Sequence, residues 1–327
     1  MQIVLGLTTR CNLKCDFCFC HHDKQHDIPD LSKVADDTIA YIINNTPPSN
    51  HYKISILGGE LFHDGIPNQT FQAYDYMLEK LTTSFQHFSP TCKCDIVCYT
   101  NAHYKKINRV INLFKKWNIE CLVSYDSVGR FKSEKQKQLV LNNIKTFVDS
   151  GVKMAPTIVL LKYQDMFGFT LSPIFKYLYN ITGIEYQECI PDIFNVNVDD
   201  ISDFYTYCLE KELFNIYNIS EVIDSYLGHV DDACKKAVVH YEGKTYLGCH
   251  YTKGESLDVL KIKAQHKFGC YTCPYYTKCG GMCWLAAQQY PKCYKKKMFD
   301  YINGHPNIII KYHEFVNNRR NKNSLCA

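Results

Sequence analysis

The stretch Cys11-Asn-Leu-Lys-Cys15-Asp-Phe-Cys18 places three cysteines within eight residues, directly after the apolar run Ile3 to Thr8. That run predicts a buried β-strand, so the cysteines are expected in the loop that follows the first strand. Three thiolates from one tight loop can hold three irons of a [4Fe–4S] cluster and leave the fourth iron without a protein ligand. This stretch therefore predicts a cluster with one open iron.

A zinc site is the alternative for the same loop. Cys20, His21 and His22 follow the three cysteines at once, and any of them could complete a tetrahedral zinc site. The choice between zinc and a cluster rests on the rest of the chain.

The first part of the chain alternates short β-rich runs with longer helical patterns, which is typical of a parallel sheet built from βα units. The predicted strands are Ile3 to Thr8, Lys53 to Leu57, Asp95 to Thr100, Glu120 to Tyr125, Met154 to Leu161 and Ile184 to Cys189. The predicted helices lie near 31–45, 68–85, 103–117, 132–150 and 171–181. Because these units are too few for a complete eight-stranded barrel, we expect an α/β fold, either a partial barrel or an open wound sheet. In both cases the chemistry is expected at the loops that follow the strands.

Composition excludes several classes of protein. The chain has 327 residues, of which 46% are hydrophobic and 21% charged, so it is not a disordered or low-complexity protein. No apolar run approaches the roughly 18 to 20 residues that a membrane span needs. The net charge of +4 disfavours a nucleic-acid partner. With no export signal at the start, we expect a cytoplasmic protein, and 18 cysteines then indicate metal binding or catalysis rather than disulfides.

Beyond Pro191 the pattern changes to helical segments near 199–215 and 219–227, and Ala237 to Gly248 then predicts a β-hairpin. A Cys-dense segment follows, with little periodicity and the spacing C-x2-C-x5-C-x3-C from Cys270 to Cys283. Such a segment is usually held together by metal. We therefore predict three parts: an α/β part over 1–190, a helical bridge over 191–230, and a metal-bound, Cys-rich domain with a C-terminal helix or tail over 231–327.

The second predicted strand ends in Gly58-Gly59-Glu60. With this segment after the second strand and C-x3-C-x2-C after the first, the chain resembles the radical S-adenosylmethionine (SAM) superfamily, in which an aromatic residue, here Phe17, precedes the last cysteine. The resemblance implies a partial (β/α)6 TIM-like barrel, in which SAM chelates the open iron. It also implies that Gly58, Gly59 and Glu60 hold the amino group of SAM.

Two later strand ends resemble segments of the same superfamily. Tyr99-Thr100-Asn101 is similar to its third-strand segment, and Ser124-Tyr-Asp126 to its fourth. The resemblance implies that Asn101, Ser124 and Asp126 contact the ribose or carboxylate of SAM. Their alternative roles are those of strand-cap or turn residues.

The C-terminal cysteines resemble the SPASM auxiliary domain of radical SAM enzymes, whose cysteine pattern implies two further [4Fe–4S] clusters. Carried over by position, the first would use Cys234, Cys249 and Cys283, and the second Cys270, Cys273, Cys279 and Cys293. Cys208 could supply the missing fourth ligand of the first, or its iron could stay open for a substrate. Zinc ribbons also use C-x2-C pairs and are the alternative for this block alone.

The resemblance implies an enzyme that reductively cleaves SAM to a 5′-deoxyadenosyl radical. We expect a peptide or protein substrate and, as the leading hypothesis, an intramolecular crosslink on a ribosomally made peptide. A flavodoxin or ferredoxin would donate the electron. Since the chain begins at the first strand, we expect the peptide leader to be recognised by the barrel, by the bridge or by a separate protein.

Four other functions stay open from the sequence. They are an anaerobic sulfatase-maturase-like protein oxidation, a small-metabolite dehydrogenase, a peptide epimerase and a non-catalytic metal-binding module. His250 stands where the sulfatase-maturating branch carries an aspartate, and it could act as a base. Cys98 and Cys189, near predicted strand ends, could donate a hydrogen atom to a substrate radical.

Overall fold

The structure is a computed structural model and describes residues 1–18, 26–126, 129–160, 163–181, 185–188, 197–229, 237–248, 257–279, 281 and 290–324. The chain divides into two compact units. The first comprises Met1–Thr157 and Asp232–Leu257, and the second Ile158–Asp231 and Asp258–Ala327. No helix among the described residues has the length and apolar character that crossing a membrane requires.

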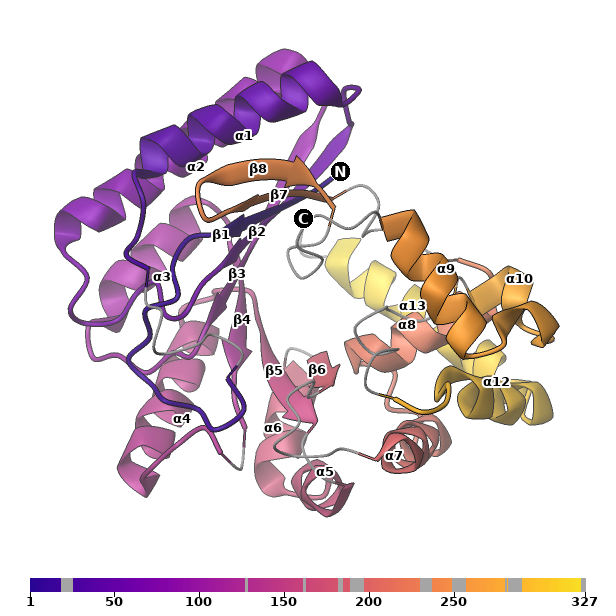
Figure 1. The fold of residues 1–327 in the computed structure, drawn as a ribbon. Helices are drawn as coiled ribbons and strands as arrows, with labels where there is room; N and C mark the ends of the chain where they lie inside the picture. The colour runs from indigo at the N-terminus through magenta and orange to yellow at the C-terminus, as the bar shows by residue number, and fades with distance from the viewer. Residues whose placement is uncertain are drawn as a thin grey trace. The chain divides into compact units, whose positions relative to one another are not determined.

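A mostly parallel sheet forms the first unit (Figure 1). Its strands are β1 (Gln2–Gly6), β2 (His51–Leu57), β3 (Lys93–Thr100), β4 (Glu120–Ser124), β5 (Met154–Leu160), β7 (Ala237–Tyr241) and β8 (Lys244–Leu247). They lie in the order β5-β4-β3-β2-β1-β7-β8, and only β7 and β8 pair antiparallel. The predicted α/β class with a parallel sheet is confirmed.

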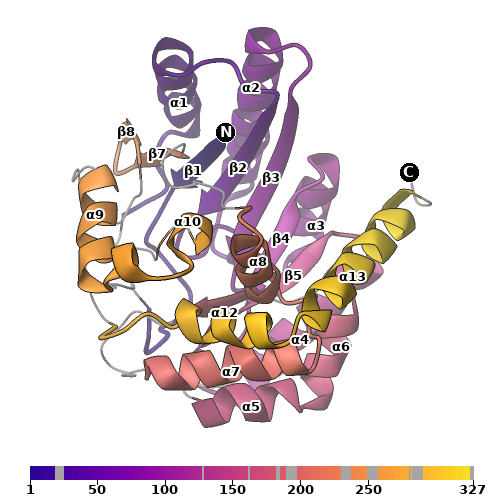
Figure 2. The same cartoon turned by 90° about the vertical axis from the view of Figure 1, so that its right-hand side faces the viewer.

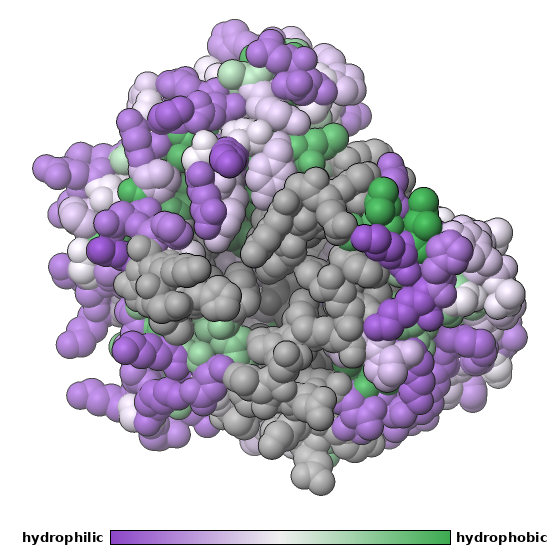
Figure 3. Space-filling model, in the orientation of Figure 1, coloured by the Kyte–Doolittle hydropathy of each residue, from purple (hydrophilic) through white to green (hydrophobic). Residues whose placement is uncertain are grey.

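Four helices connect these strands and lie on one side of the sheet (Figure 1). They are α1 (Leu31–Asn45), α2 (Asn68–Phe88), α3 (Ile107–Lys116) and α4 (Glu134–Asp149). Asp30 begins α1, since its carboxylate accepts the backbone N–H of Ser32 at 2.9 Å. Apolar residues at helical spacing are buried, among them Val34 and Ile42 of α1. The solvent side of this helix layer is mostly hydrophilic (Figure 3).

The hairpin β7–β8 belongs to the first unit, because β7 pairs in parallel with β1 over Gln2↔Ala237 to Gly6↔Tyr241. Its turn residues Glu242 and Gly243 have φ of 49° and 73°, the left-handed values that a two-residue hairpin turn requires. The hairpin predicted from this turn is confirmed. Sequence analysis grouped it with the Cys-rich segment because pairing between positions this far apart leaves no local pattern.

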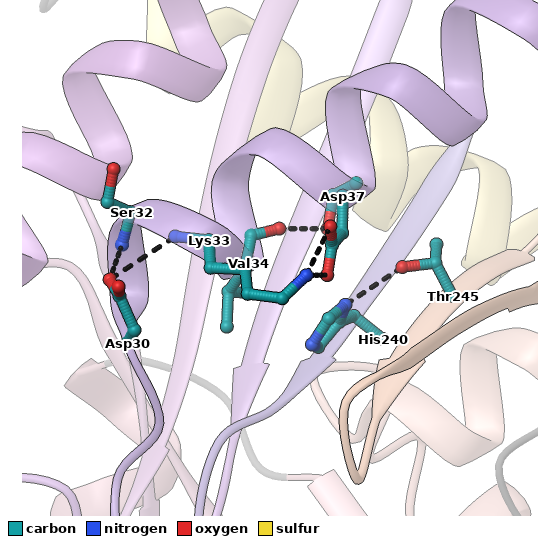
Figure 4. Close-up of polar contacts among 8 residues, drawn as sticks. Asp30, Ser32, Lys33, Val34, Asp37, His240 and Thr245 are labelled. Carbon is teal, nitrogen blue, oxygen red and sulfur yellow. Dashed lines mark hydrogen bonds and ion pairs between the residues drawn. The ribbon is translucent and has the colours of Figure 1, made fainter.

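One face of the hairpin lies against α1 (Figure 4). His240 is buried at 2% exposure, and its ring Nδ1 lies 2.8 Å from the hydroxyl of Thr245 on β8. Burial lowers the pKa of His240, an effect that Asp37 of α1 opposes and Lys33 reinforces. The buried His240 therefore links β7 to β8 through Thr245 on the side of the hairpin that contacts α1.

The second unit is mainly helical. Its elements are α5 (Tyr163–Thr170), α6 (Pro173–Ile181), β6 (Glu185–Glu188), α7 (Val198–Glu210), α8 (Tyr217–Tyr226), α9 (Leu257–Lys267), the 3₁₀ turn η3 (Cys270–Thr272), α10 (Tyr276–Cys279), α12 (Lys295–Gly304) and α13 (Asn307–Ser324). Strand β5 ends in this unit, and β6 is the next strand in the sheet order. Helices α7 and α12 lie side by side (Figure 2). Helix α5 was not expected from the sequence.

Candidate metal centres

The backbone of the cysteine loop is bound to the loop that follows β2. Gly59 donates its N–H to Thr8 O at 2.8 Å, and Glu60 donates to Arg10 O at 2.7 Å. A Cβ on Gly59 would lie 2.1 Å from Arg10 O, far inside contact distance. Only glycine therefore allows the two backbones to approach this closely. Gly59, which the resemblance assigns to the amino group of SAM, thus has the backbone of the cysteine loop as its close neighbour.

Glu60 is fully buried and joins the ends of β2 and β3. Both of its carboxylate oxygens accept from the Thr100 hydroxyl at 2.9 Å, and the backbone N–H of Asn101 donates to Oε2 at 2.6 Å. Burial raises the pKa of Glu60 to about 7, against the lowering effect of these hydrogen bonds. In this structure Glu60 orders the loops around the cysteines, and its predicted contact with the amino group of SAM stays a prediction.

Asn101 leads from this carboxylate to the cysteine loop. Its side-chain amide lies 3.5 Å from Cys11 Sγ and donates to the Asn12 side chain at 2.8 Å. Asn12 in turn donates to the backbone oxygen of His103 at 2.5 Å. The third-strand segment therefore supports the cysteine loop through a chain of amide hydrogen bonds.

Arg130 lies next to Cys15 of the loop, and no sequence motif indicated it. Its Nη1 is 3.6 Å from Cys15 Sγ, and its Nε forms an ion pair with Asp126. Its guanidinium carbon is 5.1 Å from the centre of the Phe17 ring. A single arginine in a loop has no distinguishing spacing, so no local pattern could have indicated this role. Asp126, predicted to meet SAM, lies beside Arg130 at 1% side-chain exposure.

The three cysteines lie close enough to influence one another. The pKa of Cys11 is raised to about 12, mainly by burial, with smaller contributions from the negative charges of Glu60, Cys15 and Cys18. Burial also raises the pKa of Cys15, whereas the Arg130 cation lowers it. Thiolates that are buried, mutually repelling and faced by N–H donors need a positive centre to be stable. This donor set fits a [4Fe–4S] cluster held by Cys11, Cys15 and Cys18.

A second group of cysteines lies in the second unit, around a cavity of about 220 Å³. Two short turns and the start of α12 bring the group together, and its members are Cys270, Cys273, Cys279 and Cys293. Backbone bonds fix the turns, with Cys273 N–H donating to Cys270 O at 3.0 Å and Cys279 N–H to Tyr275 O at 2.8 Å. These are the four residues expected to hold the second auxiliary cluster.

Electrostatics connect all four thiols. Burial raises the pKa of Cys270 to about 11, and Cys293, Cys279 and Cys273 each contribute to the rise. Burial also raises the pKa of Cys293, against backbone N–H donors from Lys296 and Lys295 at the start of α12. Four cysteines around one cavity fit an iron–sulfur cluster by their chemistry. Among the described residues, no set of three His, Cys, Asp or Glu side chains is close enough for a single metal ion.

Other predicted residues have different surroundings. Cys98 is fully buried near Cys121 and near Tyr74 of α2. Cys208 is buried in α7, and Ser124 is the half-buried last residue of β4. The predicted residues that lie outside the described part of the chain are Cys189, Cys234, Cys249, His250 and Cys283.

A cavity of about 570 Å³ borders the cysteine loop within the first unit. The loops after β2, β3 and β4 form its walls, and its lining includes Asn12, His63, His103, Lys105 and Lys135. Burial lowers the pKa of both His63 and His103. The cavity lies at the edge of the sheet where parallel αβ folds place their chemistry.

Comparison with known proteins agrees with this arrangement. Residues 3–146 match the family model described as a 4Fe-4S single cluster domain. No curated protein matches the chain. The fold is similar to that of anSMEcpe with bound AdoMet, at 14% identity and a TM-score of 0.69, over 96% of this chain and 99% of that one.

Two solved structures of similar fold contain peptides. Native anSMEcpe with bound AdoMet and Kp18Cys peptide has 15% identity and a TM-score of 0.70, over 96% of this chain and 99% of that one. Streptococcus suis SuiB bound to precursor peptide SuiA has 15% identity and a TM-score of 0.51, over 87% of this chain and 72% of that one. These likenesses establish the fold of the chain.

Proposed function

We propose that this chain, which has the radical SAM fold and matches a 4Fe-4S family over residues 3–146, is an enzyme that cleaves SAM reductively and oxidises a peptide. The observation that carries the proposal is the loop after β1, where N–H donors face the sulfurs of Cys11 and Cys15 at 3.5 and 3.6 Å. When bound there, a [4Fe–4S] cluster and SAM supply a 5′-deoxyadenosyl radical that removes a hydrogen atom from an unactivated C–H bond.

The residues around this loop bind and shield the reacting centre. Phe17 is buried at 6% exposure beside Cys18 and excludes water from that side. We assign Gly58 and Ser124, at the ends of β2 and β4, to contacts with SAM. Glu60 keeps the loops after β2 and β3 in place for these contacts through its bonds to Thr100 and Asn101.

The substrate we propose is a ribosomally made peptide, and the product contains an intramolecular crosslink. Support comes from structures of similar fold that contain peptides. Joining two peptide atoms in this way removes two hydrogen atoms, as two protons and two electrons. One electron and one proton leave with 5′-deoxyadenosine, so the second electron needs an acceptor within the protein. The four-cysteine cavity of the second unit is the acceptor site we propose.

We propose three [4Fe–4S] clusters in total. The third uses Cys234, Cys249 and Cys283, with Cys208 as its candidate fourth ligand. The protein would then bind about twelve irons, four for each cluster.

An external protein supplies the first electron in this proposal. Lys14 of the cysteine loop is exposed, as are Lys105 and Lys135 at the neighbouring cavity. Positive charge at this edge favours an acidic donor such as a flavodoxin or ferredoxin.

The test is anaerobic reconstitution followed by reduction in the presence of SAM and candidate precursor peptides. We expect about twelve irons per chain, formation of 5′-deoxyadenosine and a peptide lighter by two hydrogens. Zinc in place of iron, or iron without SAM cleavage, would leave a metal-stabilised binding protein as the better account. SAM cleavage with an unchanged peptide mass would contradict the crosslinking step alone.

A further inference from the structure

We propose that Arg130 is a positioning residue that holds the Cys15 thiolate and raises the reduction potential of the cluster bound at this loop. The inference rests on the proposed function, because it concerns the same cluster. It goes beyond that function in assigning the control of the potential to one buried cation outside the cysteine motif.

Arg130 lies close to the Cys15 sulfur and is largely buried. Nη1 of Arg130 lies 3.6 Å from Cys15 Sγ, which is within reach of an N–H to sulfur hydrogen bond. The Arg130 side chain is only 10% exposed, so water screens its charge weakly. The face of the Phe17 ring, 5.1 Å from the guanidinium carbon, covers the cation further.

The guanidinium of Arg130 has a fixed orientation. Asp126 pairs with Nε and is itself 1% exposed, so the pair lies almost entirely in the protein interior. A guanidinium presents several N–H groups in one rigid plane. With Nε held by the carboxylate, Nη1 remains directed at the Cys15 sulfur.

The cysteine loop and the loop after β4 are bound to each other around Cys15. Asp16 donates its N–H to Gly129 O at 2.9 Å, directly next to Arg130. The side chain of Asp16 also forms an ion pair with Lys132. The backbone bond therefore sets the position of Arg130 against the sulfur, and the ion pair adds little because both of its side chains are more than half exposed.

The cysteines of the loop have different neighbours. Cys11 faces the neutral amide of Asn101 at 3.5 Å, whereas Cys15 faces a cation. Reduction of a cluster adds one negative charge to the unit formed by the iron, the sulfide and the thiolates. A nearby buried cation and an N–H donor to sulfur both favour that extra charge, so they raise the potential.

The test uses five variants of the full chain, reconstituted with iron and sulfide. They are R130Q, R130K, D126N, the double variant D126N/R130Q and the control K132Q, which removes a charge that is 56% exposed beside the same loop. The midpoint potential is measured by redox titration, followed through the electron paramagnetic resonance signal that changes when SAM is added. SAM affinity is measured separately by equilibrium binding.

We expect R130Q to lower the ratio of reduced to oxidised cluster at least tenfold at a fixed reductant potential, which corresponds to 59 mV for a one-electron couple. R130K should lower this ratio less than R130Q does, because lysine keeps the positive charge but lacks the planar guanidinium with its several N–H groups. D126N should shift the potential in the opposite direction, since it leaves the cation unpaired. K132Q should change the ratio little, because its charge is exposed and screened.

The double variant D126N/R130Q protects the test against misfolding, since it leaves no unpaired carboxylate in the interior. We expect it to shift the potential in the same direction as R130Q. A wild-type potential in both R130Q and the double variant would overturn the inference, and weakened SAM binding with that unchanged potential would assign Arg130 to SAM instead. A wild-type protein that takes up no iron would overturn the proposed function as well.

Discussion

The two groups of cysteines differ in what brings them together. The loop after β1 is held from outside by Gly59, Glu60, Asn101 and Arg130, which all come from later βα loops of the sheet. The four cysteines of the second unit lie on turns of three and four residues and next to the start of α12, and each of them is partly exposed.

This difference suggests two ways of making a cluster site. The barrel forms the first site before any metal arrives, because its contacts are between protein groups. The second site is packed through aromatic side chains such as Tyr275 against Phe299, but its cysteines lie on or next to very short elements, so we expect bound metal to contribute much of its local stability. Altering the first site should therefore abolish activity and leave the fold intact. Removing metal from the second site should unfold the residues around it.

The largest expected effect is that of Cys15→Ala. We expect SAM cleavage to fall to the level of the reaction without protein, because the loop loses one of three ligands, while the circular dichroism spectrum keeps its native form. Cys94→Ala is the matched control, since Cys94 is a half-buried thiol at the start of β3 and should keep activity and iron content. An active Cys15→Ala variant would contradict the first half of the comparison.

Removal of iron by a chelator tests whether bound metal stabilises the four-cysteine site. We expect residues 268–279 to lose most of their protection against hydrogen exchange, because η3 and α10 are too short to be stable alone. Strands β1 to β4 should stay protected. Equal protection of both regions before and after chelation would show that the second site is also preformed.

Gly59→Ala tests how closely the two loops of the first site must approach each other. The added Cβ would lie 2.1 Å from Arg10 O, and the required backbone shift should cost about 1–3 kcal/mol in the free energy of unfolding. Urea denaturation measures the loss. Gly304→Ala at the end of α12 is the control, because nothing lies within 4 Å of its added Cβ. An unchanged stability for Gly59→Ala would mean that the loops are free to separate.

The smallest expected effect concerns acid and the hairpin. Because burial lowers the pKa of His240, the unfolded chain binds more protons at this group. The stabilisation is therefore present above pH 6.5, the ordinary value for histidine, and is lost as the pH falls through the lowered pKa. His240→Gln should reduce this acid sensitivity of the first unit by less than about 1 kcal/mol, measured by urea denaturation at several pH values.

His87→Gln is the matched control for this change, since His87 is an exposed histidine of α2. An acid response of His240→Gln equal to that of the wild type would assign the pH dependence to other groups.

Periodicity and motif spacing predicted most of the first unit. The helix predicted over 31–45 is α1 with the same bounds, and the strand predicted from Lys53 begins two residues earlier, at His51. These elements were predictable because alternating and helical apolar patterns are local. The three-cysteine loop was predictable from its own close spacing, whereas the four-cysteine group was carried over from a family resemblance.

The remaining features depend on contacts between distant positions. Arg130 and Cys15 are 115 positions apart, and nothing in either neighbourhood indicates that they meet. The fully buried position of Glu60 likewise depends on Thr100 and Asn101, 40 and 41 positions away. Pairing of β7 with β1 is the most distant case of the same problem.

That last pairing has a consequence for synthesis of the chain. Gln2 pairs with Ala237, so one edge of β1 has no partner until the ribosome has made the hairpin. At 5 to 20 residues per second, the delay is roughly 12 to 47 seconds for the 235 positions that separate the partners. During that interval the nascent chain exposes an apolar strand edge next to the three thiols of the cysteine loop. Protection of this edge by a chaperone would then determine how much protein survives to receive iron.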